Sequence, residues 1–268
     1  MTIITSTIGA FICTAYLLIW LSSGERGSLV EARKRASSGL SKFKFQQSMA
    51  VEAISPWYDS IKDVFYVADF DNNAVKLIDS SDRVKVLDIV SEVPLSGPFG
   101  VSGPGGGMFY LTELTGNRVS YASERGDVLH VSVIAGSRSG ECGMSGDGYS
   151  PLLALLCKPR GLFYHQHRNA LYIADSGNYR IRVINLSDMY IDSFSGFVSP
   201  SEFDNTVNLL PQMTNYEPAD VFIDSADDVL YFLDYGKGAV YYGNVDSERF
   251  ESKITYSMSE QDERSNAS

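Results

Sequence analysis

The feature that most constrains the fold of this chain is a motif that occurs four times between residues 64 and 243. In each copy an aromatic residue stands three positions before an acidic residue, and a β-branched residue stands six positions after it. Apolar and polar residues alternate on both sides of the acid, which predicts two strands joined by a tight turn. We expect each acid to end its first strand and to accept hydrogen bonds from N–H groups of the turn. The four acids are Asp69, Glu113, Asp175 and Asp234.

Further strands are predicted on both sides of each hairpin. Pro98, Pro159 and Pro218 lie 15 or 16 residues before their acids, and proline borders strands where no ladder N–H is needed. In the first unit, residues 50–54 supply that strand instead. A last strand is predicted after each hairpin, at residues 84–90, 128–135, 190–194 and 253–258. Sheets this small must stack on their neighbours to bury their faces, so the sequence predicts an all-β fold, a β-propeller of about four blades.

The third unit resembles an NHL repeat. It combines Pro-Arg-Gly-Leu at 159–162 with Asp-Ser-Gly-Asn-Tyr-Arg-Ile at 175–181, and Ser-Gly-Asp-Gly at 145–148 is similar to linkers between NHL blades. The second and first units match the motif in part, and the fourth lacks its Asn and Arg. The resemblance covers roughly residues 48–258 and implies an NHL-type propeller. NHL propellers usually close with five or six blades, so a count of four leaves ring closure open.

Residues 3–21 form an uncharged, apolar stretch. As a helix it would extend roughly 28 Å, close to the thickness of a bilayer core. The small residues at 22–24 permit cleavage as a signal peptide, whereas the basic cluster of residues 26–44 is typical of a retained anchor with a cytosolic flank. We therefore divide the chain into a signal peptide or transmembrane anchor (1–24), a basic linker (25–47), the propeller (48–258) and an acidic, disordered tail (259–268). The protein is expected to be membrane-anchored or secreted, on a side left open.

Charge argues against a nucleic-acid partner. The chain carries a formal net charge of −11, and its first 50 residues hold six basic and two acidic side chains, so the remainder carries −15. A folded part this acidic repels a phosphate backbone. We therefore expect no nucleic acid among the partners.

Two cysteines and one asparagine are candidates for covalent modification. Cys142 and Cys157 flank a glycine-rich loop, and they form either a disulfide, in an oxidising compartment, or two reduced thiols. Asn185-Leu-Ser187 is a glycosylation acceptor by pattern. Both modifications depend on which side of the membrane the domain occupies.

No catalytic, cofactor-binding or metal-binding residues are predicted. His165 and His167 have a spacing that can bind zinc, but they fall in a turn-like stretch. Asp69-x-Asp71-x-Asn73 begins like a calcium loop but lacks the glycine that such a loop needs, so a hairpin turn explains it better. No nucleophile elbow is present.

The absence of an assembled catalytic set favours a non-catalytic scaffold that binds a protein or ligand at a membrane or in the secretory pathway. The alternative is a metal-dependent lyase or hydrolase on a related propeller. Arg118 and Arg180 occupy equivalent places in two repeats and form either a binding rim for an acidic ligand or hydrogen bonds to acids of neighbouring blades. Long loops at 91–107, 136–158 and 196–217 are the other candidate contact sites, since propellers bind through loops.

Overall fold

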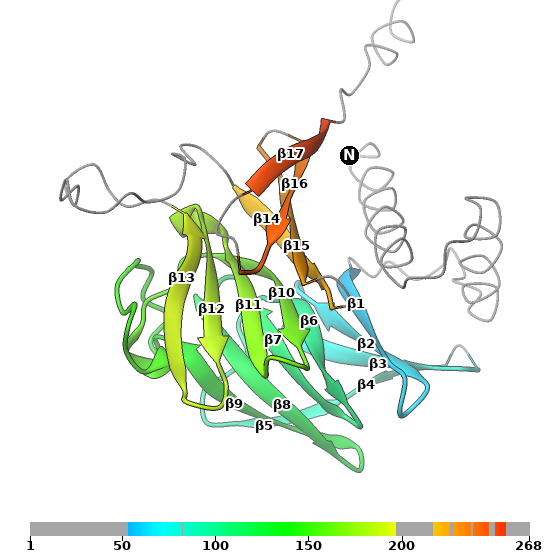
Figure 1. Cartoon of the computed structure of the whole chain (residues 1–268). Coiled ribbons are helices and arrows are strands. Elements are labelled where there is room, and N and C mark those ends of the chain that lie inside the picture. The colour runs from blue at the N-terminus through cyan, green and yellow to red at the C-terminus, as the bar shows by residue number, and fades with distance from the viewer. Residues whose placement is uncertain are drawn as a thin grey trace, which may run out of the picture.

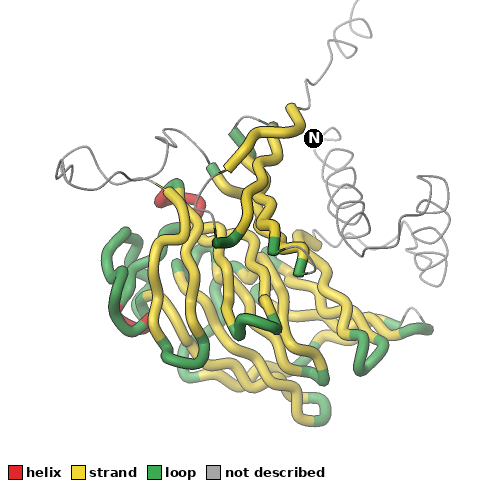
Figure 2. The backbone as a smooth tube through the Cα atoms, viewed as in Figure 1, coloured by secondary structure: helices red, strands yellow, loops and turns green. Residues whose placement is uncertain are grey.

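The computed structural model describes residues 53–81, 83–196, 217–225, 228–236, 238–246 and 250–255. They form seventeen strands in four sheets, which we call blades 1 to 4 (Figure 1). Strands make up almost all of the regular structure, and the two helices described are single 3-10 turns (Figure 2). The predicted all-β class is therefore confirmed. The predicted N-terminal helix at 3–21, the basic linker and the acidic tail lie outside the described residues.

The strands follow one another along the chain. Blade 1 contains β1 (Ala53–Asp59), β2 (Val64–Asp69), β3 (Ala74–Asp79) and β4 (Val84–Val86). Blade 2 contains β5 (Asp88–Ser91), β6 (Pro98–Gly105), β7 (Met108–Glu113), β8 (Arg118–Arg125) and β9 (Val128–Gly136). Blade 3 contains β10 (Pro159–His165), β11 (Ala170–Asp175), β12 (Arg180–Asn185) and β13 (Tyr190–Gly196). Blade 4 contains β14 (Pro218–Asp224), β15 (Val229–Asp234), β16 (Ala239–Asn244) and β17 (Phe250–Thr255), and the 3-10 turns are η1 (Pro151–Leu153) and η2 (Ser176–Asn178).

The repeated hairpin has the same geometry in all four blades. Each acid of the motif is the last ladder residue of its strand and faces the residue five positions later, as Asp69 faces Ala74 and Asp234 faces Ala239. The residue just before that partner adopts a left-handed backbone conformation, with φ between 50° and 57°. Asparagine and glycine tolerate this conformation best, which explains why the turns are rich in them. These left-handed residues are Asn73, Asn117, Tyr179 and Gly238.

One predicted strand is divided between two blades. Residues 84–90 were expected to form a single strand of the first unit. In the structure β4 pairs with β3 in blade 1, whereas β5 runs parallel to β9 on the outer edge of blade 2. Leu87 lies between them, buried, and its N–H bonds to the carbonyl of Val75 at 3.0 Å. The chain therefore crosses from blade to blade within one extended segment.

The hydrophobic core lies in layers between consecutive blades, as stacked sheets require. The first layer joins blades 1 and 2 around Tyr66 and Phe109, whose ring centroids are 4.6 Å apart. The second joins blades 2 and 3 around Leu171 and Ile173, and the third joins blades 3 and 4 around Phe232. Each layer takes its side chains from both flanking sheets, so no blade buries its faces alone.

Apart from β5, which is an added parallel strand, the first strands of consecutive blades lie against one another, β1 against β6, β6 against β10 and β10 against β14 (Figure 1). Glycines permit this approach. A Cβ atom on Gly100 would lie 2.7 Å from the carbonyl oxygen of Arg160, and one on Gly161 would lie 2.6 Å from the Cα of Asp220. Four sheets stacked face to face with their first strands adjoining form a propeller-like architecture.

Within the described ranges, no helix has the length and apolar composition needed to cross a membrane.

Candidate interaction site

The acids and prolines of the repeat form a structural frame. Pro98, Pro159 and Pro218 are buried and stand in register opposite Glu113, Asp175 and Asp234. Proline has no N–H to donate to the acid opposite it. The acid therefore accepts the backbone N–H of a residue that stands one or two positions before the proline. The donors are Ser96 to Glu113 at 2.8 Å, Cys157 to Asp175 at 2.8 Å and Glu217 to Asp234 at 3.3 Å.

These backbone donors differ from the predicted ones. Asp69 does accept from its turn, through the N–H of Asn72 at 3.4 Å and the amide of the same side chain at 2.9 Å, and it pairs with Lys76. In the other three blades the backbone N–H named above comes from the segment that enters the first strand. The acid thus ties the start of its blade to the end of the second strand. All four carboxylates are at most 2% exposed, and we assign them a structural role.

Turn asparagines extend this frame from one blade to the next. The side-chain oxygen of Asn73 accepts the N–H of Gly97 at 2.6 Å, which links blade 1 to blade 2. Asn117 makes the equivalent bond from the N–H of Lys158 at 2.8 Å, which links blade 2 to blade 3.

The structure places Arg118 and Arg180 in the interior rather than on a rim. Arg118 is 3% exposed and forms an ion pair with Glu113 at 2.6 Å within its own hairpin. Arg180 is 7% exposed and bonds to Ser193 Oγ at 2.9 Å, with Asp147 at 3.4 Å. Both guanidinium groups are held inside the fold, so they do not present a surface to an acidic ligand. Their equivalent places in the repeat did not decide between a rim and the interior.

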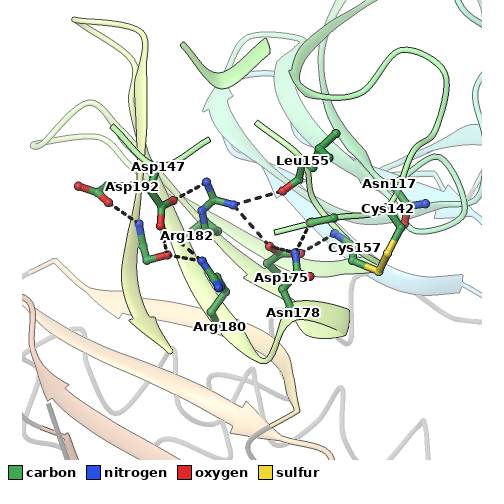
Figure 3. Close-up of polar contacts among 12 residues, drawn as sticks. Asn117, Cys142, Asp147, Leu155, Cys157, Asp175, Asn178, Arg180, Arg182 and Asp192 are labelled. Atoms are coloured by element: carbon green, nitrogen blue, oxygen red, sulfur yellow. Dashed lines mark hydrogen bonds and ion pairs between the residues drawn. A yellow bond between two sulfur atoms is a disulfide. The ribbon is translucent and has the colours of Figure 1, made fainter. Parts of the chain in front are cut away.

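Cys142 and Cys157 are joined by a disulfide, which closes the segment that we call the disulfide loop (residues 142–157; Figure 3). The loop is fastened at several further points. Tyr149 forms a β-bridge with Ile191 on β13: the N–H of Ile191 donates to the carbonyl of Tyr149 at 3.0 Å, and the N–H of Gly148 donates to the carbonyl of Ile191 at 2.9 Å. Ala154 and Leu156 are buried in the core layer between blades 2 and 3. The backbone of this loop is therefore fixed to the fold along most of its length.

A buried charge cluster also fastens the disulfide loop to β12 (Figure 3). Arg182 on β12 is fully buried, and its Nη2 lies 2.5 Å from Asp147 Oδ1. Its Nη1 donates to the carbonyl of Leu155 at 3.3 Å and lies 3.8 Å from Asp175 Oδ2. Asp147 also accepts from Ser193 Oγ at 2.6 Å. One loop carboxylate therefore compensates two arginines of β12, Arg180 and Arg182.

Burial sets the protonation behaviour of this cluster. Loss of hydration raises the pKa of Asp175 to about 6, although hydrogen bonds from Asn178 and Cys157 and the charges of two arginines oppose the rise. Burial likewise lowers the pKa of Arg182, which the Asp147 carboxylate opposes. The sequence contained one sign of this cluster, since Arg182 interrupts an apolar strand. Its partner lies 35 positions earlier, where spacing could not identify it.

Large apolar side chains project from the disulfide loop into solvent. Tyr149 is 67% exposed, Leu152 is 44% exposed and Leu153 is 70% exposed. Exposed apolar residues that stand close together on a fixed backbone are typical of contact surfaces. The predicted contact loop at 136–158 thus contains such a surface, whereas residues 197–216 of the third predicted loop lie outside the described residues.

His165 serves local packing. His165 ends β10 and is 1% exposed; its Nδ1 accepts the N–H of Arg168 at 3.1 Å, and its Nε2 lies 3.2 Å from Asp228. Burial lowers the pKa of His165. In the part of the chain that the structure describes, no three His, Cys, Asp or Glu side chains converge as metal ligands.

The predicted glycosylation acceptor lies in the turn between β12 and β13. The side-chain oxygen of Asn185 accepts the N–H of Ser187 at 2.9 Å, and its amide donates to Asp188 at 3.0 Å. Asn185 ends β12 and is half-buried, and Ser187 and Asp188 after it are exposed, so the acceptor triplet lies at the edge of the surface.

Comparison with known proteins gives a likeness of structure only. No protein-family model matches the chain, and no curated protein matches its sequence. Among solved structures, a chain of a nidogen/laminin complex superposes with a TM-score of 0.54 at 16% identity, covering 76% of this chain and 65% of that one. An auxiliary nutrient binding protein from Bacteroides ovatus gives 0.56 at 13% identity, covering 75% and 48%. Virginiamycin B lyase from Staphylococcus aureus gives 0.50 at 14%, covering 79% and 73%.

The chain spans about half to two thirds of the length of several of these proteins. At identities this low the likeness concerns the fold and not the activity. Together with the four stacked sheets, it shows that the chain has an all-β, propeller-like fold.

Proposed function

We propose that this chain is a non-catalytic, NHL-type propeller module that binds a protein partner through the disulfide loop. The observation that carries the proposal is the contrast between the backbone and the side chains of that loop. Its backbone is held by a disulfide, a β-bridge and the ion pair of Asp147 with Arg182. Its side chains at 149, 152 and 153 meet solvent. A surface ordered in advance loses little conformational freedom on binding, which favours affinity.

The assignment to the NHL type rests on the repeat. The prolines and acids of the motif occupy matching positions in blades 2, 3 and 4, and the third unit carries the fullest motif. A protein partner agrees with one structural neighbour, which comes from a complex of nidogen with laminin. The charge of −15 on residues 51–268 speaks against nucleic acid.

We place the propeller on the oxidising side of a membrane, in the secretory pathway. Structural disulfides persist in such compartments, and the Cys142–Cys157 disulfide supports this location. The apolar segment 3–21 supplies either a cleaved signal or an anchor. With a cleaved signal the module reaches partners in the lumen or outside the cell, whereas a retained anchor with a cytosolic basic flank would hold it in the cytosol and contradict this location.

The loop predicts a specific loss of binding. We expect the triple variant Tyr149→Ser, Leu152→Ser, Leu153→Ser to recover its main partner at least tenfold less efficiently than the wild type, because exposed apolar anchors contribute most of the energy of an interface. The measurement is affinity purification of the full-length, C-terminally tagged protein from the cells that produce it, quantified by mass spectrometry after mild crosslinking.

A matched triple variant controls for the loss of exposed apolar area. Ile61, Val86 and Val90 are 71%, 57% and 56% exposed and lie on blades 1 and 2. Ile61→Ser, Val86→Ser, Val90→Ser should leave recovery and thermal stability unchanged. Equal recovery of every partner by the two triple variants would refute the assignment of the contact to the loop.

The proposed location predicts a glycan at Asn185. The full-length protein made in animal cells should migrate more slowly on a gel until it is treated with an N-glycosidase, because its acceptor lies on an exposed turn. Asn185→Gln should abolish the shift in mobility that a glycan at Asn185 causes. Asn266→Gln, at the other acceptor triplet, is the matched variant and should leave that shift in place. Absence of any glycan, together with two free thiols at 142 and 157, would place the domain in the cytosol.

A further inference from the structure

A pocket lies at the junction of blades 3 and 4, at the end of the disulfide loop. Its wall is formed by Cys157 and Lys158, which lead into β10, by Gly177 and Tyr179 of the β11–β12 turn, and by Glu217 before β14. Arg160 on β10 and Ser176 complete the lining. The pocket is thus built from the three segments that the repeat frame brings together.

Two cations face this pocket with little to neutralise them. Arg160 is half-buried and lies 3.4 Å from Glu217, a long and partly exposed pair of the kind that contributes little energy. Its Nε is buried and makes no hydrogen bond within the described structure. Lys158 is exposed and has no ion-pair partner among the described residues. The pocket therefore carries an excess of positive charge on a chain whose net charge is −11.

The surrounding fold holds the guanidinium of Arg160 and the backbone of Lys158. The guanidinium of Arg160 stacks on the ring of Tyr235 at 5.2 Å. Lys158 has a left-handed backbone, with φ of 48°, and its N–H is bound by Asn117 at 2.8 Å. Tyr179 is 51% exposed and Tyr235 is 64% exposed, so aromatic surface adjoins both charges. A planar guanidinium on an aromatic face leaves an edge that can donate two parallel hydrogen bonds to a carboxylate.

We propose that this pocket binds an acidic side chain of a peptide, held by Arg160 and Lys158 and flanked by apolar residues that rest on the two tyrosines. The proposal rests on the proposed function, because it identifies what the partner on the disulfide loop presents. The guanidinium exchanges its weak contact with Glu217 for a paired contact with the incoming carboxylate.

The test uses defined peptides, so it does not depend on knowing the partner. Acetylated and amidated Leu-Glu-Leu is titrated into the full-length protein while the amide resonances of Gly177 and Tyr179 are followed by NMR. We expect saturable shifts that weaken as salt rises, and binding at least about tenfold weaker for Leu-Gln-Leu. Sodium acetate, the free carboxylate, should bind more weakly than Leu-Glu-Leu because it lacks the flanking apolar groups.

Single variants assign the two charges. Arg160→Gln and Lys158→Gln should each weaken Leu-Glu-Leu binding about tenfold, whereas Arg138→Gln, an exposed cation of blade 2 that pairs with Glu92, should leave it unchanged. Equal binding of the Glu and Gln peptides, or acetate binding as tight as peptide binding, would overturn the proposal. The serine variants of the disulfide loop address the proposed function separately. If the triple serine variant of the loop loses its partner but the wild type binds Leu-Glu-Leu and Leu-Gln-Leu equally, the pocket proposal is refuted and the proposed function is not.

Discussion

Replacing Asp147 by alanine should lower the free energy of unfolding by about 3 kcal/mol. This carboxylate compensates Arg182, which is fully buried, and also lies near Arg180. Removing one partner of a buried pair leaves the other charge without compensation, which typically costs about 3–5 kcal/mol. We take the lower end because Asp147 is itself 34% exposed and the Leu155 carbonyl still accepts from Arg182. Urea denaturation monitored by tryptophan fluorescence gives the value.

Two further variants separate this mechanism from a general loss of charge. Glu141→Ala removes an exposed acid just before the disulfide loop and should change stability by less than about 0.5 kcal/mol. Arg182→Met in the Asp147→Ala background removes the uncompensated charge and should restore much of the lost stability, since apolar side chains of similar volume replace buried pairs well. A loss in Asp147→Ala that Arg182→Met fails to reduce would show that the pair does not hold the loop.

Removing the disulfide should have an effect of similar size. A closure spanning 15 residues stabilises by about 3 kcal/mol in the chain-entropy account, so Cys142→Ser, Cys157→Ala should lower the free energy of unfolding by that amount. The loop should also become more sensitive to proteolysis, which is measured by limited digestion and mass spectrometry. Reducing agent should reproduce the effect in the wild type and add nothing in the double variant. Equal free energies of unfolding for the reduced and the oxidised wild type would contradict a stabilising role of the disulfide.

The sequence predicted the frame of this fold well because that frame is local. An acid, its hairpin and the proline 15 or 16 residues before it form one unit, and the period of the motif identifies the unit without knowledge of its neighbours. The structure sets Pro159 opposite Asp175 and Pro218 opposite Asp234 for this reason. The residue types at the turns follow as well, apart from Tyr179, a tyrosine at a left-handed position where asparagine or glycine is expected, whereas the backbone donors to Glu113 and Asp175 lie outside the turns.

What the sequence did not predict depends on contacts between distant segments. Arg118 and Arg180 alternate along strands like any surface residue, and only the stacked sheets decide that they turn inward. The pair of Asp147 with Arg182 joins a loop to a strand that are remote in the chain, so no spacing rule finds it. The crossing of residues 84–91 from one blade to the next depends likewise on where blade 2 lies, because a strand follows whichever edge offers it a ladder.

Because the chain crosses from blade 1 to blade 2 in this way, we expect the two blades to open together. β4 and β5 are separated by Leu87 alone, yet they complete different sheets. For blade 1 to separate from blade 2, either β4 must unpair from β3 or β5 must unpair from β9. Each of these changes would remove Leu87 from the core layer between the two blades. Local opening in such a segment spreads to both sheets, so the two should exchange their amide hydrogens as one cooperative unit. The join of blades 1 and 2 is thus a covalent connection as well as a packed surface, and we expect the two blades to unfold together.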